Sequence, residues 1–149
     1  MNNAQPARRQ SVTPPHGLPS LRIWQQNVNK SLEAHQDMLN NLDPRHVDVV
    51  AIQEPYIDFQ GYSRGNSHWF IVYPPNHRTL PTRTRSLLLI NRRLDSDTWR
   101  SLEISLPDIT GVQIASKDGH NILLYNVYNN QDHNRTIHLL RTHTRDARA

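Results

Sequence analysis

The sequence predicts an α/β fold in which two packed β-sheets carry helices on their outer sides. Three observations support this prediction. A strand, a helix and a second strand follow one another between residues 21 and 52, several strands then follow without helices between them, and a second amphipathic helix begins at Ile137. In a doubly wound sheet, strands and helices alternate evenly along the chain. One early and one late helix, with several strands between them, instead favour two sheets packed face to face.

The first part of the domain reads as a strand–helix–strand unit. Residues 21–26 form the first predicted strand, and Ser31 is a favourable N-cap for a helix with apolar residues at helical spacing. Asp43-Pro44 ends that helix. Residues 47–52 are an almost continuous apolar run rich in β-branched residues, so we expect a central strand that is covered on both faces. The order strand, crossover helix, strand favours parallel pairing of the two strands.

Five further strands are predicted in the rest of the chain. They lie at residues 68–73, 86–91, 99–106, 109–116 and 121–128. The stretch 99–106 alternates in part between apolar and polar residues, as a half-buried strand does. Asp118-Gly119 predicts a hairpin turn between the last two strands.

Length and composition restrict the classes of protein that fit. A chain of 149 residues holds one domain, which we assign to residues 20–149, and the Gln-, Pro- and Arg-rich residues 1–19 predict a disordered leader. The absence of cysteine excludes a disulfide partner, a thiolate metal site and a cysteine nucleophile. Without a membrane-span-length apolar run or a signal-peptide core, we expect an intracellular protein with no membrane partner. The formal charge of +4 suits a polyanionic partner such as nucleic acid.

Polar residues follow directly on two of the predicted strands. Glu54 comes just after the central strand, and Pro55 stops the ladder there because it has no N–H to donate. Asn27 and Asn29 follow the first strand. If these strands are neighbours, an amide oxygen and a carboxylate meet at one edge, and Mg²⁺ prefers hard oxygen ligands of this kind. Each residue alone also has a plainer explanation, because strands often end in a charged surface residue and Asn often caps a helix.

Three segments together resemble a known superfamily. They are W-Q-Q-N-V-N-K-S at residues 24–31, A-I-Q-E-P-Y at 51–56 and Y-N-V-Y-N at 125–129. In this order and at this spacing they resemble the endonuclease/exonuclease/phosphatase superfamily, and within it the endonuclease domain of non-LTR (LINE-type) retrotransposons. The resemblance runs from about residue 21 to the C-terminus. It implies a four-layer α/β sandwich of two mixed sheets flanked by helices, here truncated, because a complete domain of that family is longer than this chain.

The resemblance also implies a chemistry and residues that perform it. The family hydrolyses phosphodiester or phosphomonoester bonds with Mg²⁺ or Mn²⁺. Glu54 matches its metal-binding glutamate, Asn27 matches a catalytic asparagine next to the metal, and Tyr128 matches a catalytic tyrosine that positions the phosphate. Asn126 and Asn129 are weaker candidates for the same pocket. The implied partner is DNA, nicked to prime reverse transcription, and the implied location is the nucleus.

A further set of residues is expected to bind nucleic acid. It consists of Asn29 and of four arginines in two polar segments, namely Arg83, Arg85, Arg92 and Arg93. An ordinary solvated surface is an equally good explanation of the arginines.

The sequence departs from the family in its later motifs. A D-x-N, which supplies a catalytic Asp and Asn, and a C-terminal S-D-H are not in their places; Asp132-His133-Asn134 matches D-x-N but precedes the last predicted helix instead of following it. Loss of one acid–base group costs roughly 10²–10⁴-fold in rate. We therefore expect an N-terminal fragment of a nuclease domain with no meaningful turnover, and its unfinished sheet predicts self-association.

Three alternatives to a nuclease stay open at this point. The first is a catalytically dead remnant that binds nucleic acid. The second is a phosphatase-type member of the superfamily that acts on inositol phosphates or lipids. The third is a reading frame with no selected function. Steeply salt-dependent DNA binding without cleavage favours the remnant. Parallel assays on plasmid DNA and inositol phosphates separate nuclease from phosphatase.

Overall fold

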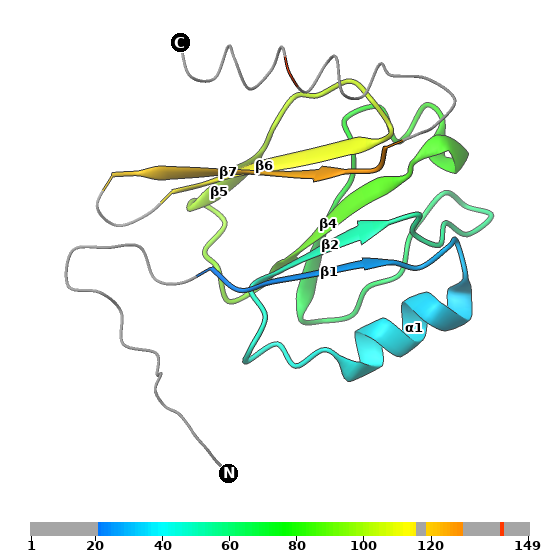
Figure 1. The fold of residues 1–149 in the computed structure, drawn as a ribbon, viewed down its shortest axis with the longest axis horizontal. Coiled ribbons are helices and arrows are strands. Elements are labelled where there is room, and N and C mark those ends of the chain that lie inside the picture. The colour runs from blue at the N-terminus through cyan, green and yellow to red at the C-terminus, as the bar shows by residue number, and fades with distance from the viewer. Residues whose placement is uncertain (1–20, 116–118, 130–140, 142–149) are drawn as a thin grey trace.

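The computed structural model of the protein describes residues 21–115, 119–129 and 141 (Figure 1). The predicted leader, part of the predicted hairpin turn and the start of the predicted second helix at Ile137 lie outside the described residues. The elements are, in chain order, β1 (Ile23–Asn27), α1 (Leu32–Asn41), β2 (Val49–Gln53), β3 (Trp69–Val72), the 3₁₀ turn η2 (Pro81–Arg83), β4 (Ser86–Asn91), β5 (Trp99–Ser101), β6 (Ile109–Ala115) and β7 (Asn121–Val127).

The first sheet has four strands in the order β1-β2-β4-β3. β1 runs parallel to β2, with Ile23 opposite Val49 and Asn27 opposite Gln53, as the strand–helix–strand order predicts. β4 is antiparallel to both of its neighbours. Because β2 and β4 occupy the middle of the sheet, every residue of these two strands is buried.

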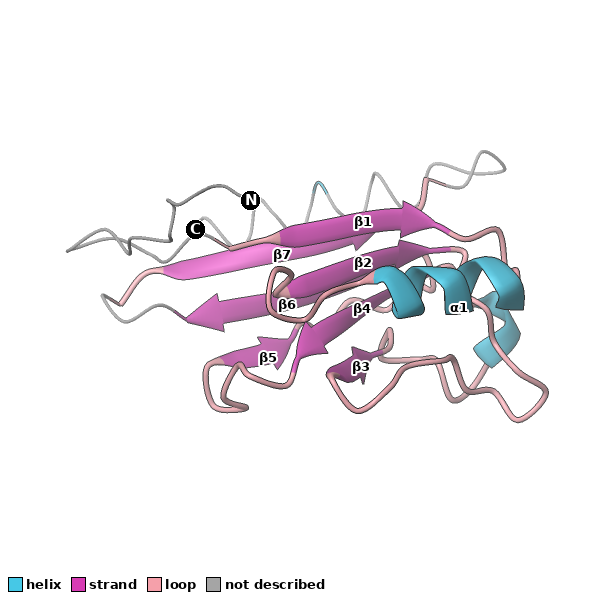
Figure 2. Cartoon of the chain, turned by 90° about the horizontal axis from the view of Figure 1, so that it is seen from below, coloured by secondary structure: helices cyan, strands magenta, loops and turns pink. Residues whose placement is uncertain are grey.

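Helix α1 crosses one face of this sheet (Figure 2). Its start follows from the predicted cap, because the Ser31 hydroxyl accepts a hydrogen bond from the Ala34 N–H over 3.1 Å. Met38 and Leu39 are buried on its inner side. After Asn41 the backbone becomes extended ahead of Pro44, which agrees with the predicted end of the helix.

The second sheet has three strands in the order β5-β6-β7, and all of its pairings are antiparallel. Among the described strands the first sheet is thus mixed and the second is antiparallel, which is consistent with the predicted truncated sandwich of two sheets. β5 is shorter than the predicted strand at 99–106. The Leu102 N–H still donates to the Gly111 carbonyl of β6, but the Ile104 N–H donates to the Leu102 carbonyl and the Leu106 N–H to that of Ile104. Local turns therefore replace the ladder beyond Leu102.

The core consists of two layers that share the central strands. Alternate residues of β2 and β4 point to opposite faces of the first sheet. The set facing α1 is Val50, Ile52, Leu87 and Leu89, which pack with Met38, Leu39 and Trp69. The set facing the second sheet is Val49, Ala51, Leu88 and Ile90, which pack with Val112 and Ile114. The described residues thus form a helix layer and two sheets, which confirms the predicted α/β class.

One edge of the first sheet is open to solvent. β1 pairs only with β2 among the described strands, and Ile23 and Trp24 on it are each 46% exposed. In the part of the chain that the structure describes, no helix is both long and apolar enough to cross a bilayer.

Candidate active site

The predicted metal-binding pair meets at one end of the first sheet. Because β1 and β2 are parallel, their carboxyl ends lie together, and the arrowhead of β7 points to the same end of the molecule (Figure 1). Asn27 Nδ2 donates a hydrogen bond to Glu54 Oε1 over 3.1 Å. Glu54 is half-buried and Asn27 is exposed, so the carboxylate is fixed yet open to a ligand from solvent.

The two ends of the Asn27 amide have different partners. Its Oδ1 accepts a hydrogen bond from the Asn29 N–H over 2.9 Å, while its nitrogen faces Glu54. In this arrangement the Asn27 amide nitrogen positions the Glu54 carboxylate, while the Asn27 amide oxygen is occupied by the backbone N–H of Asn29. The direct coordination of a metal by Asn27 stays a prediction.

Backbone strain is concentrated at this pair. The non-glycine residues with positive φ in the described ranges are Asn29 (52°), Lys30 (59°) and Glu54 (49°). Each such residue costs on the order of 1–3 kcal/mol and is kept only where its surroundings hold it. Here the Lys30 N–H donates to the Glu54 carbonyl over 2.7 Å, and the Val28 N–H donates to the Gln53 carbonyl over 3.0 Å. Strain of this kind is typical of functional sites, and the side-chain pattern gives no sign of it.

Main-chain hydrogen bonds connect Glu54 to the region of Tyr128. The Glu54 N–H donates to the Arg85 carbonyl over 2.8 Å, and the Arg85 N–H donates to the Pro107 carbonyl over 2.9 Å. Asp108 follows Pro107 in the sequence, and its carbonyl accepts a hydrogen bond from the Tyr128 N–H over 2.8 Å. Tyr128 therefore lies at the same end of the two sheets as Glu54. The structure shows no hydrogen bond that joins its hydroxyl to Glu54 or Asn27.

A cluster of amide side chains, buried at Gln53 and Asn126, lies behind the site and joins the two sheets. Gln53 Nε2 donates to Asn126 Oδ1, and Gln25 Nε2 donates to Gln53 Oε1. Asn126 Nδ2 donates to the carbonyls of Ile52 and Leu87 over 2.9 and 2.8 Å. Asn126 is only 3% exposed, so it supports the sheets and is not open to a substrate. Asn129, the other weak candidate, is exposed.

His35 fixes the segment that follows Glu54. This fully buried side chain on α1 accepts a hydrogen bond at Nδ1 from the Tyr56 N–H over 3.2 Å. Its Nε2 lies 3.0 Å from the Arg64 carbonyl, so Nε2 carries the proton of the neutral ring and donates it to that carbonyl. Burial lowers the pKa of His35, which keeps the ring neutral. This role was not predicted from the sequence, because nothing in the pattern around any one of the 9 histidines identifies its hydrogen-bond partners.

The four predicted nucleic-acid-binding arginines lie at two different places. Arg83 and Arg85 precede β4 at the Glu54 end, whereas Arg92 and Arg93 follow β4 at its other end. A six-residue strand spans roughly 17–20 Å. Arg83 is exposed, and Arg85 Nη1 donates to the carbonyls of Thr82 and Thr84. The structure therefore places Asn29, Arg83 and Arg85 at the Glu54 end of the first sheet, and Arg92 and Arg93 at its opposite end.

Arg92 and Arg93 have partners of their own. Arg93 Nη2 lies 2.9 Å from Asp48 Oδ1, which also receives Arg22 Nη2 at 3.1 Å. Burial acts to raise the pKa of the Asp48 carboxyl, but the hydrogen bonds from Arg22 and the two positive charges outweigh it, so the pKa lies below its usual value. The Arg92 guanidinium lies 5.6 Å from the centroid of the Phe70 ring.

The donor set at Glu54 fits a single magnesium ion. The described residues contain no group of three or more His, Cys, Asp or Glu side chains that would hold a metal by themselves. Mg²⁺ commonly binds through one or two carboxylates and completes its shell with water and substrate phosphate. One half-buried carboxylate held by an amide donor, beside exposed basic residues, meets this requirement.

Comparison with known proteins supports the fold. No protein-family model matches the chain, and neither does any curated protein. Among solved structures the chain is similar to the endonuclease domain of TRAS1, a telomere-specific non-LTR retrotransposon, with a TM-score of 0.62 and 16% sequence identity. The match covers 86% of this chain and 54% of that chain. At this identity it confirms the predicted resemblance at the level of the fold, and the chain spans about half of that structure's length.

Proposed function

We propose that this chain is the metal-binding portion of a Mg²⁺-dependent DNA endonuclease domain of retrotransposon type. One observation carries the proposal. The Asn27–Glu54 hydrogen bond of 3.1 Å stands at the carboxyl ends of two parallel strands, in a fold similar to that of the TRAS1 endonuclease domain. Mn²⁺ is expected to replace Mg²⁺, because both accept oxygen ligands.

Each residue of the site has a distinct task under this proposal. Glu54 holds the cation, and Asn27 restrains the carboxylate through its amide N–H groups. When bound, Mg²⁺ supplies Lewis-acid polarisation of the phosphoryl group and stabilises charge on the leaving oxygen. Tyr128 is our candidate for contact with the phosphate, and the exposed Arg83 offsets the charge of the DNA backbone.

The chain is proposed to bind metal and DNA but to cleave slowly. We assign no described residue as the base that activates the attacking water, and the S-D-H motif that the resemblance implies does not occur in the sequence. The TRAS1 domain extends well beyond the length that this chain matches. Full cleavage is therefore proposed to require a general base that the described residues do not supply.

Metal binding provides the test. Mn²⁺ binding is measured by electron paramagnetic resonance, with Mg²⁺ as competitor, for the wild-type chain, Glu54→Gln and the control Glu33→Gln on the exposed side of α1. We expect Glu54→Gln to lose at least about tenfold in affinity and Glu33→Gln to bind as the wild type does. Wild-type affinity in Glu54→Gln would refute the assignment of the metal site. Rapid Mg²⁺-dependent nicking of supercoiled plasmid, lost in Glu54→Gln, would refute slow cleavage.

A nucleic-acid-binding protein without catalysis is the second candidate. It is favoured by the placement of Asn29, Arg83 and Arg85 at one end of the first sheet. DNA binding that falls steeply with salt, and that is unchanged by Mn²⁺ and by Glu54→Gln, is the result that supports it.

A further inference from the structure

One buried histidine holds both ends of the loop at residues 56–64, which begins two residues after Glu54. His35 on α1 accepts a hydrogen bond at Nδ1 from the Tyr56 N–H over 3.2 Å, and its Nε2 lies 3.0 Å from the Arg64 carbonyl. The imidazole is fully buried. Because Tyr56 and Arg64 are the first and last residues of the loop, this single ring closes the loop onto the helix.

The other side of the loop is attached to the segment that follows β3. The Ser63 N–H donates to the Tyr73 hydroxyl over 3.0 Å. The Gly61 carbonyl lies 2.6 Å from His77 Nε2. In the described residues, no hydrogen bonds other than these two and those of His35 join the loop to the rest of the chain. Loss of the His35 contacts would therefore detach the loop from α1 and leave it attached beside β3.

The contacts of His35 require a neutral ring. A carbonyl oxygen only accepts, so Nε2 carries the single proton and Nδ1 is left as the acceptor for the Tyr56 N–H. In the charged imidazole both nitrogens are donors, and the Nδ1–H would then face the Tyr56 N–H. One proton therefore converts this hydrogen bond into a contact between two donors.

The surroundings of His35 also oppose the charged ring. Burial lowers the pKa of His35, and the positive charge of Arg64 lowers it further, while the hydrogen bond to the Arg64 carbonyl acts in the opposite sense without outweighing them. The Arg64 guanidinium lies 5.5 Å from the centroid of the Tyr56 ring, so it is held on the loop itself. Protonation of His35 therefore adds a repulsion between α1 and the loop.

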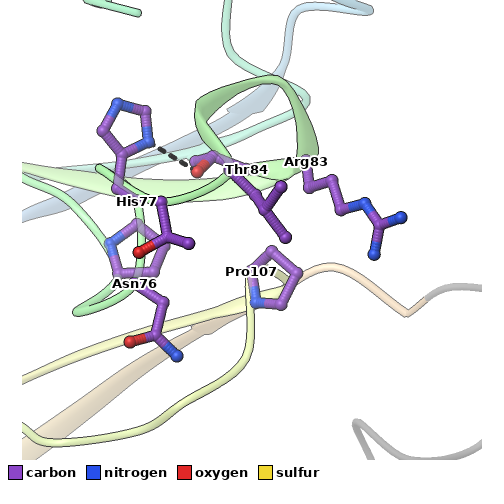
Figure 3. A pocket seen from close by; sticks show the side chains of 8 residues that line it. Asn76, His77, Arg83, Thr84 and Pro107 are labelled. Atoms are coloured by element: carbon purple, nitrogen blue, oxygen red, sulfur yellow. Dashed lines mark hydrogen bonds between the residues drawn. The ribbon is translucent and has the colours of Figure 1, made fainter.

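His77 is also buried, but its contacts accommodate a proton. Its Nε2 donates to the Gly61 carbonyl, and its Nδ1 lies 2.6 Å from the Thr84 hydroxyl (Figure 3). A hydroxyl donates or accepts as it rotates, so this contact persists when Nδ1 carries a proton. His77 is therefore a matched control, a buried histidine whose protonation breaks no hydrogen bond.

We propose that His35 is an acid-sensitive latch, which closes the loop at residues 56–64 onto α1 at neutral pH and releases the loop from α1 when the ring is protonated. The released loop moves about its attachments beside β3, and the two sheets keep their pairing. The latch goes beyond the proposed function and does not depend on it. It places the mobility of the segment after Glu54 under the control of pH.

Hydrogen–deuterium exchange of the full chain at pH 7.5 and pH 5.5 tests the latch. Measured exchange rates are divided by the intrinsic rates at each pH, which gives the opening constant of each segment. A peptide covering residues 56–64 reports on the loop, and a peptide covering β4 reports on the sheets. The test variant is His35→Gln, whose amide offers an acceptor and donors but does not titrate. His77→Gln and the exposed His68→Gln are the controls.

In the wild type and both controls, the opening constant of the loop should rise at least about fivefold between pH 7.5 and pH 5.5. Opening increases by up to about tenfold for each pH unit below the ordinary histidine value of 6.5, as long as the ring stays neutral in the closed loop. His35→Gln should abolish this rise. At both pH values the loop should open at least about tenfold more often than β4.

Two results of the exchange experiment would overturn the proposal. A merely structural His35 predicts that His35→Gln opens the loop more often at both pH values and leaves the factor between them unchanged. Release through global unfolding predicts that the loop and β4 have equal opening constants at pH 5.5.

A second measurement needs no variant. Nuclear magnetic resonance of the ¹⁵N-labelled wild type follows the His35 imidazole and the Tyr56 amide through the same pH range. The ring should be the neutral Nε2–H tautomer at pH 7.5, and its titration should coincide with a change at the Tyr56 amide. Titration of the ring with no change at that amide would refute the latch. Neither experiment contains metal, so both are independent of the result for Glu54→Gln in the Mn²⁺ assay.

Discussion

Asn27 and Glu54 lie 27 residues apart in the sequence and 3.1 Å apart in space, from amide nitrogen to carboxylate oxygen. The contact depends on the parallel pairing of β1 and β2, which places their carboxyl ends side by side. Since the Asn27 oxygen already accepts the Asn29 N–H, the amide nitrogen can point only towards the carboxylate. The orientation of Glu54 is thus fixed from the neighbouring strand.

Removal of the Asn27 amide is expected to weaken metal binding without unfolding the protein. Groups that orient a metal ligand typically contribute 10- to 100-fold to affinity, so Asn27→Ala should lose about tenfold in Mn²⁺ affinity. Asn29→Gly is the matched control, because only the backbone N–H of Asn29 is used and glycine adopts its φ of 52° freely. Mn²⁺ titration checks both variants, and equal affinities for Asn27→Ala and the wild type would contradict the positioning role.

Asn126 is expected to matter for stability and not for ligand contact. Asn126→Ala removes hydrogen bonds to Ile52 and Leu87 and leaves the Gln53 amide without its acceptor. The loss in unfolding free energy should be about 2–4 kcal/mol. The exposed Asn129→Ala should change it by less than about 0.5 kcal/mol. Urea unfolding measures both, and a stable Asn126→Ala with reduced metal or DNA affinity would restore Asn126 as a site residue.

The stability should fall when the pH drops below the ordinary histidine value of 6.5. Burial lowers the pKa of His35 and of His77 in the folded state. As the pH falls, these two histidines therefore bind protons in the unfolded chain before they do so in the folded protein. Their contribution to the unfolding free energy is complete above pH 6.5 and is lost as the pH falls through the folded pKa values. Urea midpoints from pH 8 to 5 show this slope. His35→Gln should reduce it, and His35→Gln with His77→Gln should remove it.

The arginines at the two ends of β4 should differ in their effect on DNA binding. Arg83→Gln is expected to lower affinity and to reduce the slope of log K against log salt by about one. Arg92→Gln, with an equal change in charge about 17–20 Å away, should leave that slope nearly unchanged. Binding titrations at several salt concentrations decide this. Equal effects of both variants would indicate only a diffuse field of positive charge.

Self-association is expected through the open edge at β1. Ile23 and Trp24 are each 46% exposed there, and an edge strand presents unpaired backbone groups to other chains. Trp24→Lys should shift the sedimentation velocity profile towards monomer. Leu32→Lys adds the same charge at a 41% exposed position at the start of α1 and should have no such effect. An unchanged profile for Trp24→Lys would assign association to another surface.

The sequence predicted those features that depend on local pattern. β2 and β4 were predictable because buried central strands need continuous apolar runs, and α1 because Ser31 and the apolar spacing mark its start. The Gln53–Asn126 contact was not, because its partners are 73 residues apart and an amide gives no sign of its acceptor. The division of the arginines between two ends also required the direction of β4, which periodicity alone does not give.

The position of Glu54 at the end of β2 has a consequence for how the protein opens. β2 is buried at all five positions and is paired on both sides, so its amide protons should be among the slowest to exchange with deuterium. Loops such as residues 58–62, where Phe59 is 96% exposed, open far more often. The Glu54 carboxylate is therefore attached to the strand that should unfold last. Metal affinity should stay constant during local opening of the loops and disappear only with cooperative unfolding of the first sheet.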